Sequence, residues 1–594
     1  MNHASNSVEQ SKIHTALSAG LYVVVCGYAV LAIVSSFAAP VDKFDDAIPL
    51  LHGMLVQQGY TPNLDFYSFY PPLNLYLNAA AFRLLGRTVI AERVVGDIFY
   101  VIILLLVTWF FRSRFRSWGP VVPAAVLVVA TSIGAAITLP VWSGFAISLA
   151  ALLTYLCSQN VERHRVWLVA LSGVLAALAI LCRINFGCYA AAVIALDFVR
   201  RLWLDRDERN SRHLRTELTM MGAFAVPLVV CCIGFCLWIY GRSIDTAVSQ
   251  FIVTAQRLMA ARGFIRLPFQ AHLACVVVLP ASWFSFRLLN GSSSLTIKAF
   301  LPATLGVGVL LLALTFGANF TIAVIAVALE VALVVFMHIF IRRLEVCELS
   351  ILLFFCCLLH YYLSRADWFH WRLLPVAGAL LMPFLFMSSY DAHKRQFESS
   401  TSMGTILLVM AMAVFVFVAA PEFRPGFTAF PKGLTLIANF VHDLHSTDSD
   451  RMLGSTAPPP VWSSVYPDDG ELAALRYLRQ RSDNSTPLFV GLRDHSRAFW
   501  NDLRMYWLAE RPIAVRTFQL EAKVATETAV QREIIADLER NKKIWVILDS
   551  DRDGDEEFSK TRYQGSKLLD RYIEQNFREQ ATFGHFVVLT RASD

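Results

Sequence analysis

The residues best suited to chemistry in this chain lie between positions 44 and 88. Asp45 and Asp46 are adjacent, Asp65 adds a third carboxylate, and an aromatic-Pro-Pro element follows at 70–72. A carboxylate can act as a general base that takes a proton from an acceptor hydroxyl. Neighbouring helical residues point about 100° apart, so one of the pair faces a given site, and which one stays open. The alternative is that Asp45 and Asp46 only cap the following helix, as Asp does at helix starts.

The composition indicates that membrane helices position these residues. The chain has 594 residues, of which 56% are hydrophobic and 16% charged, whereas soluble chains have roughly 45–50% and about 25%. A wholly soluble enzyme, a disordered scaffold and a small secreted disulfide protein are therefore excluded. The 11 cysteines lie in the apolar part of the chain and are expected to act as small hydrophobic residues. A net charge of +6 gives no indication of nucleic-acid binding.

About thirteen apolar stretches reach the roughly 20 residues that a bilayer-crossing helix needs. We therefore predict a polytopic α-helical membrane protein. The predicted spans centre on residues 17–38, 97–111, 120–138, 143–157, 166–182, 184–199, 218–240, 268–286, 299–316, 320–340, 348–363, 372–389 and 403–420. Lys and Arg concentrate in alternate short loops, which predicts a cytoplasmic N-terminus. An odd number of spans then places everything after about residue 421 outside.

The predicted organisation has three parts. Residues 1–421 form the transmembrane module, with a first outer loop at 39–96, residues 422–464 form a juxtamembrane linker, and residues 465–594 form an extracytoplasmic α/β domain. In the last part, predicted helices at 471–481, 529–542 and 567–577 alternate with continuous apolar strands at 487–492, 544–550 and 585–590. This alternation is typical of a small α/β layer.

Arginines gather near the predicted outer helix ends, where the topology rule disfavours them. They are Arg242, Arg257, Arg262, Arg266, Arg365 and Arg372, with Arg183 in the short outer turn at 182–186. Arginine binds phosphate through paired hydrogen bonds. Taken together, these arginines therefore predict binding of a phosphate head group at the outer leaflet. For any single residue, the alternative is an interfacial arginine whose stem lies along lipid.

The segment 44–88 resembles the first extracytoplasmic loop of GT-C glycosyltransferases, polytopic enzymes that use polyprenyl-phosphate sugars. After the acidic pair come Gly59, Asp65, Tyr70-Pro71-Pro72 and Gly86 in the order typical of that loop. LCRINFGCY (181–189) is similar to the family's short outer turn, and LSRADWFHWRLLP (363–375) to its late Arg-x-Asp-x-x-His element. Asp367 and His370 would share a helix face, and the alternative there is an interfacial ion pair.

The resemblance implies an inverting glycosyltransferase in the plasma (inner) membrane of a bacterium. It would move a sugar from a polyprenyl-phosphate donor to a hydroxyl of a glycan or lipid acceptor of the cell envelope, with membrane lipids around it. The catalytic carboxylate would be Asp45, with Asp46 second and Asp65 third. The donor phosphate would be held by Arg183, Arg266, Arg365, His370 and Tyr70, supported by Asp367 and Asn185.

Two departures limit what the resemblance implies. Tyr70 stands where the aminoarabinose-transferase branch has a Lys before Pro-Pro, and residues 137–145 lack the acid that this branch and the protein mannosyltransferases have near span four. No metal ligand and no cofactor are assigned, and a divalent metal stays an open alternative. A flippase or transporter of a lipid-linked sugar is the competing function, but it should show polar or broken helices at the midplane, and the central spans are almost uncharged. A receptor whose C-terminal part binds glycan is the third.

Overall fold

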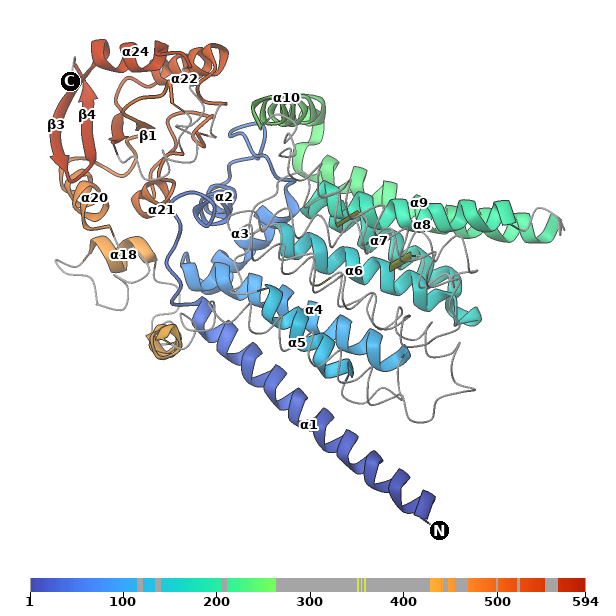
Figure 1. Ribbon diagram of the computed structural model, residues 1–594. Helices are drawn as coiled ribbons and strands as arrows, with labels where there is room; N and C mark the ends of the chain where they lie inside the picture. Colours follow the sequence, from blue (N-terminus) through green and yellow to red (C-terminus); the bar gives the residue numbers. More distant parts are fainter. Residues whose placement is uncertain are drawn as a thin grey trace, which may run out of the picture.

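The computed structural model describes ten stretches of the chain and a few single helical positions. The stretches are residues 2–114, 121–133, 140–204, 211–262, 428–439, 447–454, 468–497, 500–520, 524–550 and 565–592, and the single positions lie at 350–358, 376 and 441. Helices dominate these residues, and a small sheet lies at the C-terminal end of the molecule (Figure 1).

Long helices form one side of the molecule. They are α1 (Asn2–Ser36), α4 (Val89–Arg114), α5 (Val121–Ile133), α6 (Pro140–Ser158), α7 (Arg165–Cys182), α8 (Ile184–Leu204) and α9 (Ser211–Tyr240). Helix α7 packs between α6 and α9, and α5 contacts both α1 and α4. Five stretches are long and apolar enough to cross a membrane: Thr15–Ser36, Val89–Ser113, Val141–Ser158, Glu162–Cys182 and Leu214–Thr254.

These stretches coincide with five of the predicted spans, and two more predicted spans also fall on helices. The span predicted at 120–138 falls on the shorter apolar helix Val122–Thr131, and the span at 184–199 falls on α8. The spans predicted from residue 268 onward lie outside the described residues, apart from the single helical positions. The total of about thirteen therefore stays a prediction.

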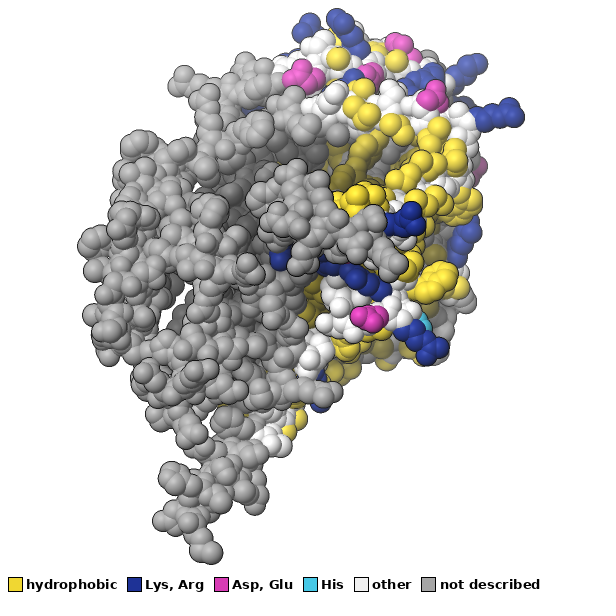
Figure 2. Space-filling view, turned by 90° about the vertical axis from the view of Figure 1, so that its right-hand side faces the viewer, with side chains coloured by type: hydrophobic (Ala, Val, Ile, Leu, Met, Phe, Trp, Pro, Cys, Tyr) yellow, Lys and Arg dark blue, Asp and Glu magenta, His cyan; other side chains and the backbone are white. Residues whose placement is uncertain are grey.

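The outward surface of the helical part is apolar. Large hydrophobic side chains of α9 that are about half exposed or more include Val226, Val229, Val230, Ile233, Leu237 and Trp238. Figure 2 shows hydrophobic side chains over much of the described face, with charged side chains most numerous at its upper end. Such a surface is stable against lipid rather than water. The described helices are therefore those of a multi-pass membrane protein.

Helix α8 carries charge inside the helical part. Asp197 is buried, accepts a hydrogen bond from the Tyr155 hydroxyl at 2.6 Å, and pairs with Arg201 at 2.7 Å. Charges within membrane helices are costly and are found where partners satisfy them. The three side chains therefore join α8 to α6 through a buried polar contact at Asp197 Oδ2.

The C-terminal elements form a four-stranded sheet with helices packed on it. They are α20 (Asp469–Arg481), β1 (Leu488–Leu492), α21 (Arg504–Ala509), α22 (Thr528–Arg540), β2 (Trp545–Asp549), α24 (Leu568–Asn576), β3 (Phe577–Phe583) and β4 (Phe586–Arg591). The strand order is β1-β2-β4-β3, with β1 and β2 parallel and the other pairs antiparallel. The predicted strands and helices of this part agree with β1, β2, β4, α20, α22 and α24 within two residues. The sequence analysis missed β3, which begins at Phe577.

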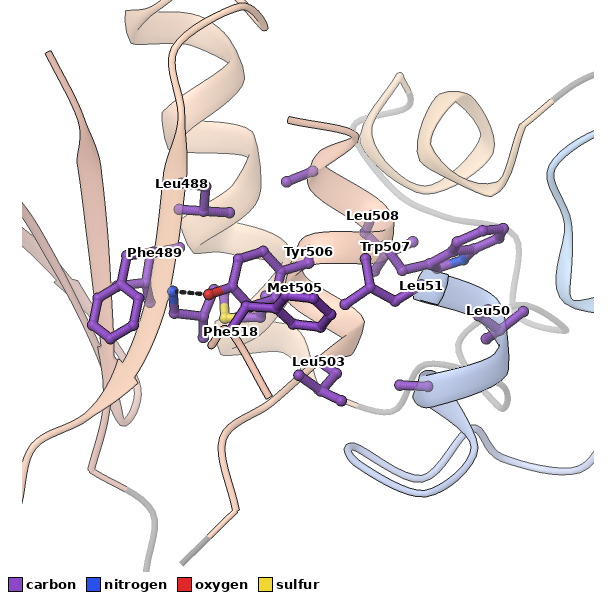
Figure 3. Packing of buried hydrophobic residues seen from close by; sticks show 14 of the residues in the cluster. Leu50, Leu51, Leu488, Phe489, Leu503, Met505, Tyr506, Trp507, Leu508 and Phe518 are labelled. Carbon is purple, nitrogen blue, oxygen red and sulfur yellow. Dashed lines mark hydrogen bonds between the residues drawn. The ribbon is translucent and has the colours of Figure 1, made fainter. Parts of the chain in front are cut away.

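Two short helices between α1 and α4 pack against the C-terminal elements. They are α2 (Ala47–Gln57) and α3 (Leu73–Leu85). One buried cluster contains residues from 37–91 and residues from 436–589. Figure 3 shows Leu50 and Leu51 of α2 beside Trp507 and Leu508 of α21. The parts predicted as 1–421 and 465–594 thus share a hydrophobic core, which we call the joint.

Aromatic rings and one hydroxyl complete the joint. The Phe82 ring of α3 lies 5.2 Å from the Trp507 ring, measured between centroids. His52 is fully buried, with its ring 5.2 Å from that of Phe66 and 5.7 Å from that of Phe518. Burial lowers the pKa of His52 to about 3, so its imidazole is neutral. On the strand side, the Val490 N–H donates to the Tyr506 hydroxyl oxygen at 2.8 Å (Figure 3).

Truncating Leu51 should destabilise the joint, because the side chain is fully buried there. We expect Leu51→Ala to cost about 2–5 kcal/mol of folding free energy and to lower the apparent Tm of the detergent-solubilised protein. Leu84→Ala is the matched control, since Leu84 of α3 is 71% exposed and should change stability by no more than about 0.5 kcal/mol. Equal Tm values for both variants would contradict a shared core.

Candidate functional site

A tight turn with three carboxylates precedes α2. The Asp42 carboxylate accepts the backbone N–H groups of Phe44 and Asp45, each at 2.8 Å. The Asp46 carboxylate accepts the N–H of Asp42 at 3.1 Å. Asp46 is the N-cap residue of α2, but its side chain makes no cap hydrogen bond. The capping alternative therefore does not describe what the Asp46 side chain does.

Asp46 instead faces a buried arginine on α4. The Arg93 guanidinium lies 3.6 Å from Asp46 Oδ2 and 3.3 Å from Glu92 Oε2, measured from its nearest nitrogens. All three side chains are buried. Burial raises the pKa of the Asp46 carboxyl above its ordinary value, and the Arg93 charge opposes that rise. A cation between two carboxylates compensates charges that would be costly in isolation.

The other two predicted carboxylates are exposed. Asp65 accepts the Thr61 N–H at 2.7 Å, so it is used within its own turn. Asp45 lies in the turn before α2, directly beside the buried Asp46. The adjacent pair is therefore split, with one carboxylate open to solvent and one in a buried ion pair. This is the one-in, one-out arrangement expected from the helical angle between neighbours.

Two residues from separate predicted motifs meet in the structure. The guanidinium carbon of Arg183 lies 5.2 Å from the centroid of the Tyr70 ring, within the range of a cation–π contact. Arg183 is the C-cap residue of α7, directly before α8, and Asn185 is exposed in the first turn of α8. A Cβ at Gly144 of α6 would come 2.9 Å from the Arg183 Cβ, so only glycine fits this approach.

A buried hydrogen bond fixes α3 against α6 close to this pair. The Ser143 hydroxyl donates to the Asn74 side-chain oxygen at 2.8 Å. Asn74 directly follows the first residue of α3, and Ser143 precedes Gly144. The Tyr70-Pro71-Pro72 element is thus held against the membrane helices from which Arg183 projects.

Four of the predicted site residues lie outside the described residues: Arg266, Arg365, Asp367 and His370. Within the described stretches there is no group of three or more His, Cys, Asp or Glu side chains able to hold a metal ion. The sequence analysis missed Glu92 and Arg93. Their signal was an acid and a base side by side at the start of a mostly apolar helix.

The fold and these contacts define a multi-pass membrane protein with a carboxylate turn and an arginine–tyrosine pair where the membrane helices meet the joint. The chain is similar to solved structures of ArnT from Cupriavidus metallidurans. The form bound to undecaprenyl phosphate has a TM-score of 0.47 and 12% identity, covering 96% of this chain and 98% of that one. For the apo form the TM-score is 0.39 with 12% identity, over 96% and 97% of the two chains.

A third similar structure is the Archaeoglobus fulgidus oligosaccharyltransferase in complex with zinc and sulfate. Its TM-score is 0.43 with 12% identity, and the match covers 88% of this chain and 67% of that one. No protein-family model and no curated protein matches the chain. The function proposed below therefore depends on the residues of this chain.

Removing the Arg93 charge should destabilise the protein more at pH 8 than at pH 5. Arg93→Gln leaves Asp46 and Glu92 buried without their cation, which costs about 3–5 kcal/mol when both are ionised. The Asp46 pKa is already raised in the folded state and should rise further, so protonation at lower pH relieves the cost. Apparent Tm values of the solubilised protein at both pH values measure this.

Arg479→Gln is the control for this experiment. Arg479 pairs with Asp450 at 3.2 Å in a largely exposed contact, which contributes about 0–1 kcal/mol. Its loss should lower Tm slightly and by the same amount at both pH values. An Arg93→Gln effect that is equally small, or independent of pH, would show that the buried ion pair does not form.

Proposed function

We propose that the protein is an inverting GT-C glycosyltransferase that moves a sugar from a polyprenyl-phosphate donor to an acceptor hydroxyl of the cell envelope. One observation carries the proposal: Asp45 is an exposed carboxylate held in a fixed turn, beside the buried Asp46–Arg93 pair. A solvent-exposed carboxylate can reach an incoming hydroxyl, whereas a buried one cannot. The cation–π contact between Arg183 and Tyr70 supports the proposed phosphate site.

In the proposed reaction, Asp45 accepts the proton of the acceptor hydroxyl. The hydroxyl oxygen attacks the anomeric carbon on the face opposite the phosphate, and a new carbon–oxygen bond forms there. The bond between the anomeric carbon and the polyprenyl phosphate breaks, and the phosphate leaves with the electron pair. The configuration at the anomeric carbon is inverted, and the acceptor's proton ends on the carboxylate.

Arg183 would stabilise the charge that grows on the leaving phosphate. Its guanidinium is well suited, because it stays charged and binds phosphate through paired hydrogen bonds. The Tyr70 ring orients this guanidinium through the cation–π contact. In the proposal, Arg266, Arg365 and His370 complete the phosphate site, with Asp367 and Asn185 in support.

The proposed orientation has a cytoplasmic N-terminus and places the joint and the C-terminal elements beyond the outer leaflet of a bacterial plasma membrane. The lipid of the donor would enter between membrane helices, and a glycan or lipid acceptor would approach from the extracytoplasmic side. Undecaprenyl phosphate, which one of the ArnT structures contains, is a suitable probe for the leaving group.

Substituting Asp45 should separate chemistry from folding. We expect Asp45→Asn to abolish sugar transfer, because an amide cannot accept the acceptor's proton, while membrane insertion and Tm stay unchanged. The measurement is mass spectrometry of cell-envelope glycans from a deletion strain carrying each variant. Asp483→Asn, at an exposed acid of the C-terminal elements that bonds Ser485, is the control and should restore the glycans. Full transfer by Asp45→Asn, alone and combined with Asp46→Asn, would remove the proposed base.

The Tyr70 ring should contribute to phosphate binding only through Arg183. Tyr70→Phe keeps the aromatic face, so the affinity for undecaprenyl phosphate should stay within about twofold of the original. Tyr70→Leu removes about 0.5–1 kcal/mol of cation–π energy and should weaken binding about two- to fivefold. Titration of the protein in nanodiscs measures both. If the two variants bind equally, the ring does not orient Arg183 for the phosphate.

A further inference from the structure

The first residue of helix α4, Val89, contacts Asp448, which lies 359 residues later in the sequence. Asp448, the first residue of α18 (Asp448–Leu453), is 1% exposed. Its carboxylate accepts the Val89 N–H at 2.8 Å, and its own N–H donates to the Arg87 carbonyl at 3.1 Å. Val89 is the first residue of α4, where backbone N–H groups have no partner inside the helix. A carboxylate there satisfies the amide and complements the helix dipole.

The contact between Asp448 and the start of α4 is made in both directions, and neighbouring residues add further contacts. Thr88, just before α4, accepts the Ala91 N–H through its hydroxyl at 3.1 Å. The Arg87 side chain pairs with Glu510, the residue after α21, at 3.2 Å. The start of α4 is therefore tied to the C-terminal part of the chain at two points, through Asp448 at Val89 and through Glu510 at Arg87, just before the helix.

Helix α18 is itself held by the C-terminal elements. Arg476 of α20 donates to the Met452 carbonyl at 2.9 Å, and Arg479 of α20 pairs with Asp450 at 3.2 Å. The Thr447 hydroxyl accepts the Asp450 N–H and caps the helix. The segment predicted as a linker thus forms a bracket between α20 and the start of α4.

The first two turns of α4 carry Arg93, which lies four residues after Val89 and so on the same face of the helix. We propose that Asp448 is a positioning residue that fixes the start of α4 so that Arg93 holds Asp46 and the turn carrying Asp45. The role of that turn rests on the proposed function. The series of contacts that links Asp448 to Val89, and Arg93 of the same helix to Asp46, does not depend on the proposed function.

The charges around Asp46 determine how the titration of its carboxyl would change if the bracket loosened. Asp46 faces Asp42 on its own turn and Arg93 on α4, and Glu92 contacts Arg93 from the neighbouring position. If the start of α4 frays while Asp46 stays buried, Arg93 moves away and the positive charge that opposes the effect of burial on the Asp46 pKa is lost. Its carboxyl should then hold a proton to higher pH.

Two measurements on the full-length solubilised protein test the proposal without any substrate. Hydrogen exchange reports on the backbone amides of residues 90–93. The rate of Asp46 labelling by dicyclohexylcarbodiimide, which reacts with protonated carboxyls, reports its titration when followed against pH by mass spectrometry. For Asp448→Ala we expect exchange about five- to tenfold faster and a labelling midpoint shifted upward by about half a pH unit or more.

Three further variants sharpen the test. Asp448→Asn keeps an acceptor oxygen and should restore most of the protection. Asp450→Asn changes the neighbouring acid of α18, whose largely exposed pair with Arg479 contributes little to stability, and it should shift both readouts less than Asp448→Ala does. Val89→Pro removes the donated N–H from the other side at a helix position where proline is tolerated, and it should reproduce the effect of Asp448→Ala if that variant fails to fold.

Unchanged exchange in both Asp448→Ala and Val89→Pro would overturn the bracket. Faster exchange with an unchanged labelling midpoint would overturn the link to Asp46. Neither result touches the proposed function, which is tested by Asp45→Asn in the glycan assay. Full transfer by Asp45→Asn would in turn remove the glycosyltransferase proposal and leave the bracket standing.

Discussion

The packing of α2 against α21 joins two parts of the chain that are far apart in sequence into one buried core. Leu50 and Leu51 from one end of the chain and Trp507 and Leu508 from the other exclude water from the same core. Backbone contacts fix the register: the Leu503 N–H donates to the Lys43 carbonyl at 2.8 Å, and the Tyr67 N–H donates to the Arg516 carbonyl at 3.1 Å. Because Lys43 lies in the turn before α2, this packing also sets the position of the carboxylate turn.

Charges at the joint divide into buried pairs that impose geometry and exposed pairs that do not. Arg504 is buried with Asp502 and Glu471, which lie 2.5 Å and 3.2 Å from its guanidinium, and it also donates to the Val41 carbonyl. Burial raises the pKa of Glu471 above its ordinary value. Breaking such a pair leaves a buried charge without its partner, which is costly. These contacts therefore restrict how the elements of the joint can be arranged.

The contact between α10 (Ile244–Arg262) and α22 is of the other kind. Arg257 and Glu533 form a paired contact at 2.7 Å and 3.0 Å, but both side chains are about one-third exposed. An ion pair in contact with water contributes little to stability. The C-terminal elements are therefore attached firmly through α2 and α3 and weakly through α10.

The sequence predicted the strands that contain an unbroken apolar run and the helices with an apolar face. The segments 487–492, 544–550 and 585–590 each contain at least three consecutive apolar residues, and each forms a strand. Strand β3 was missed because FREQATF is mostly exposed and polar and directly continues a helix. The joint itself could not be predicted, because hydrophobic periodicity shows that α2 has an apolar face but not that its partner lies more than 400 residues later. The pairing of Tyr70 with Arg183 followed from no local pattern either, although both were candidates from the family resemblance.

The order in which the chain is made gives the joint a further consequence. Leu50 and Leu51 leave the ribosome about 450 residues before Trp507. At typical synthesis rates this interval is on the order of half a minute to a minute and a half. During that time α2 and α3 present an uncovered apolar surface at the membrane, so a chaperone, the lipid surface or the translocation machinery must shield it. Truncated chains that end before α21 would keep that surface permanently and should be prone to aggregation or degradation.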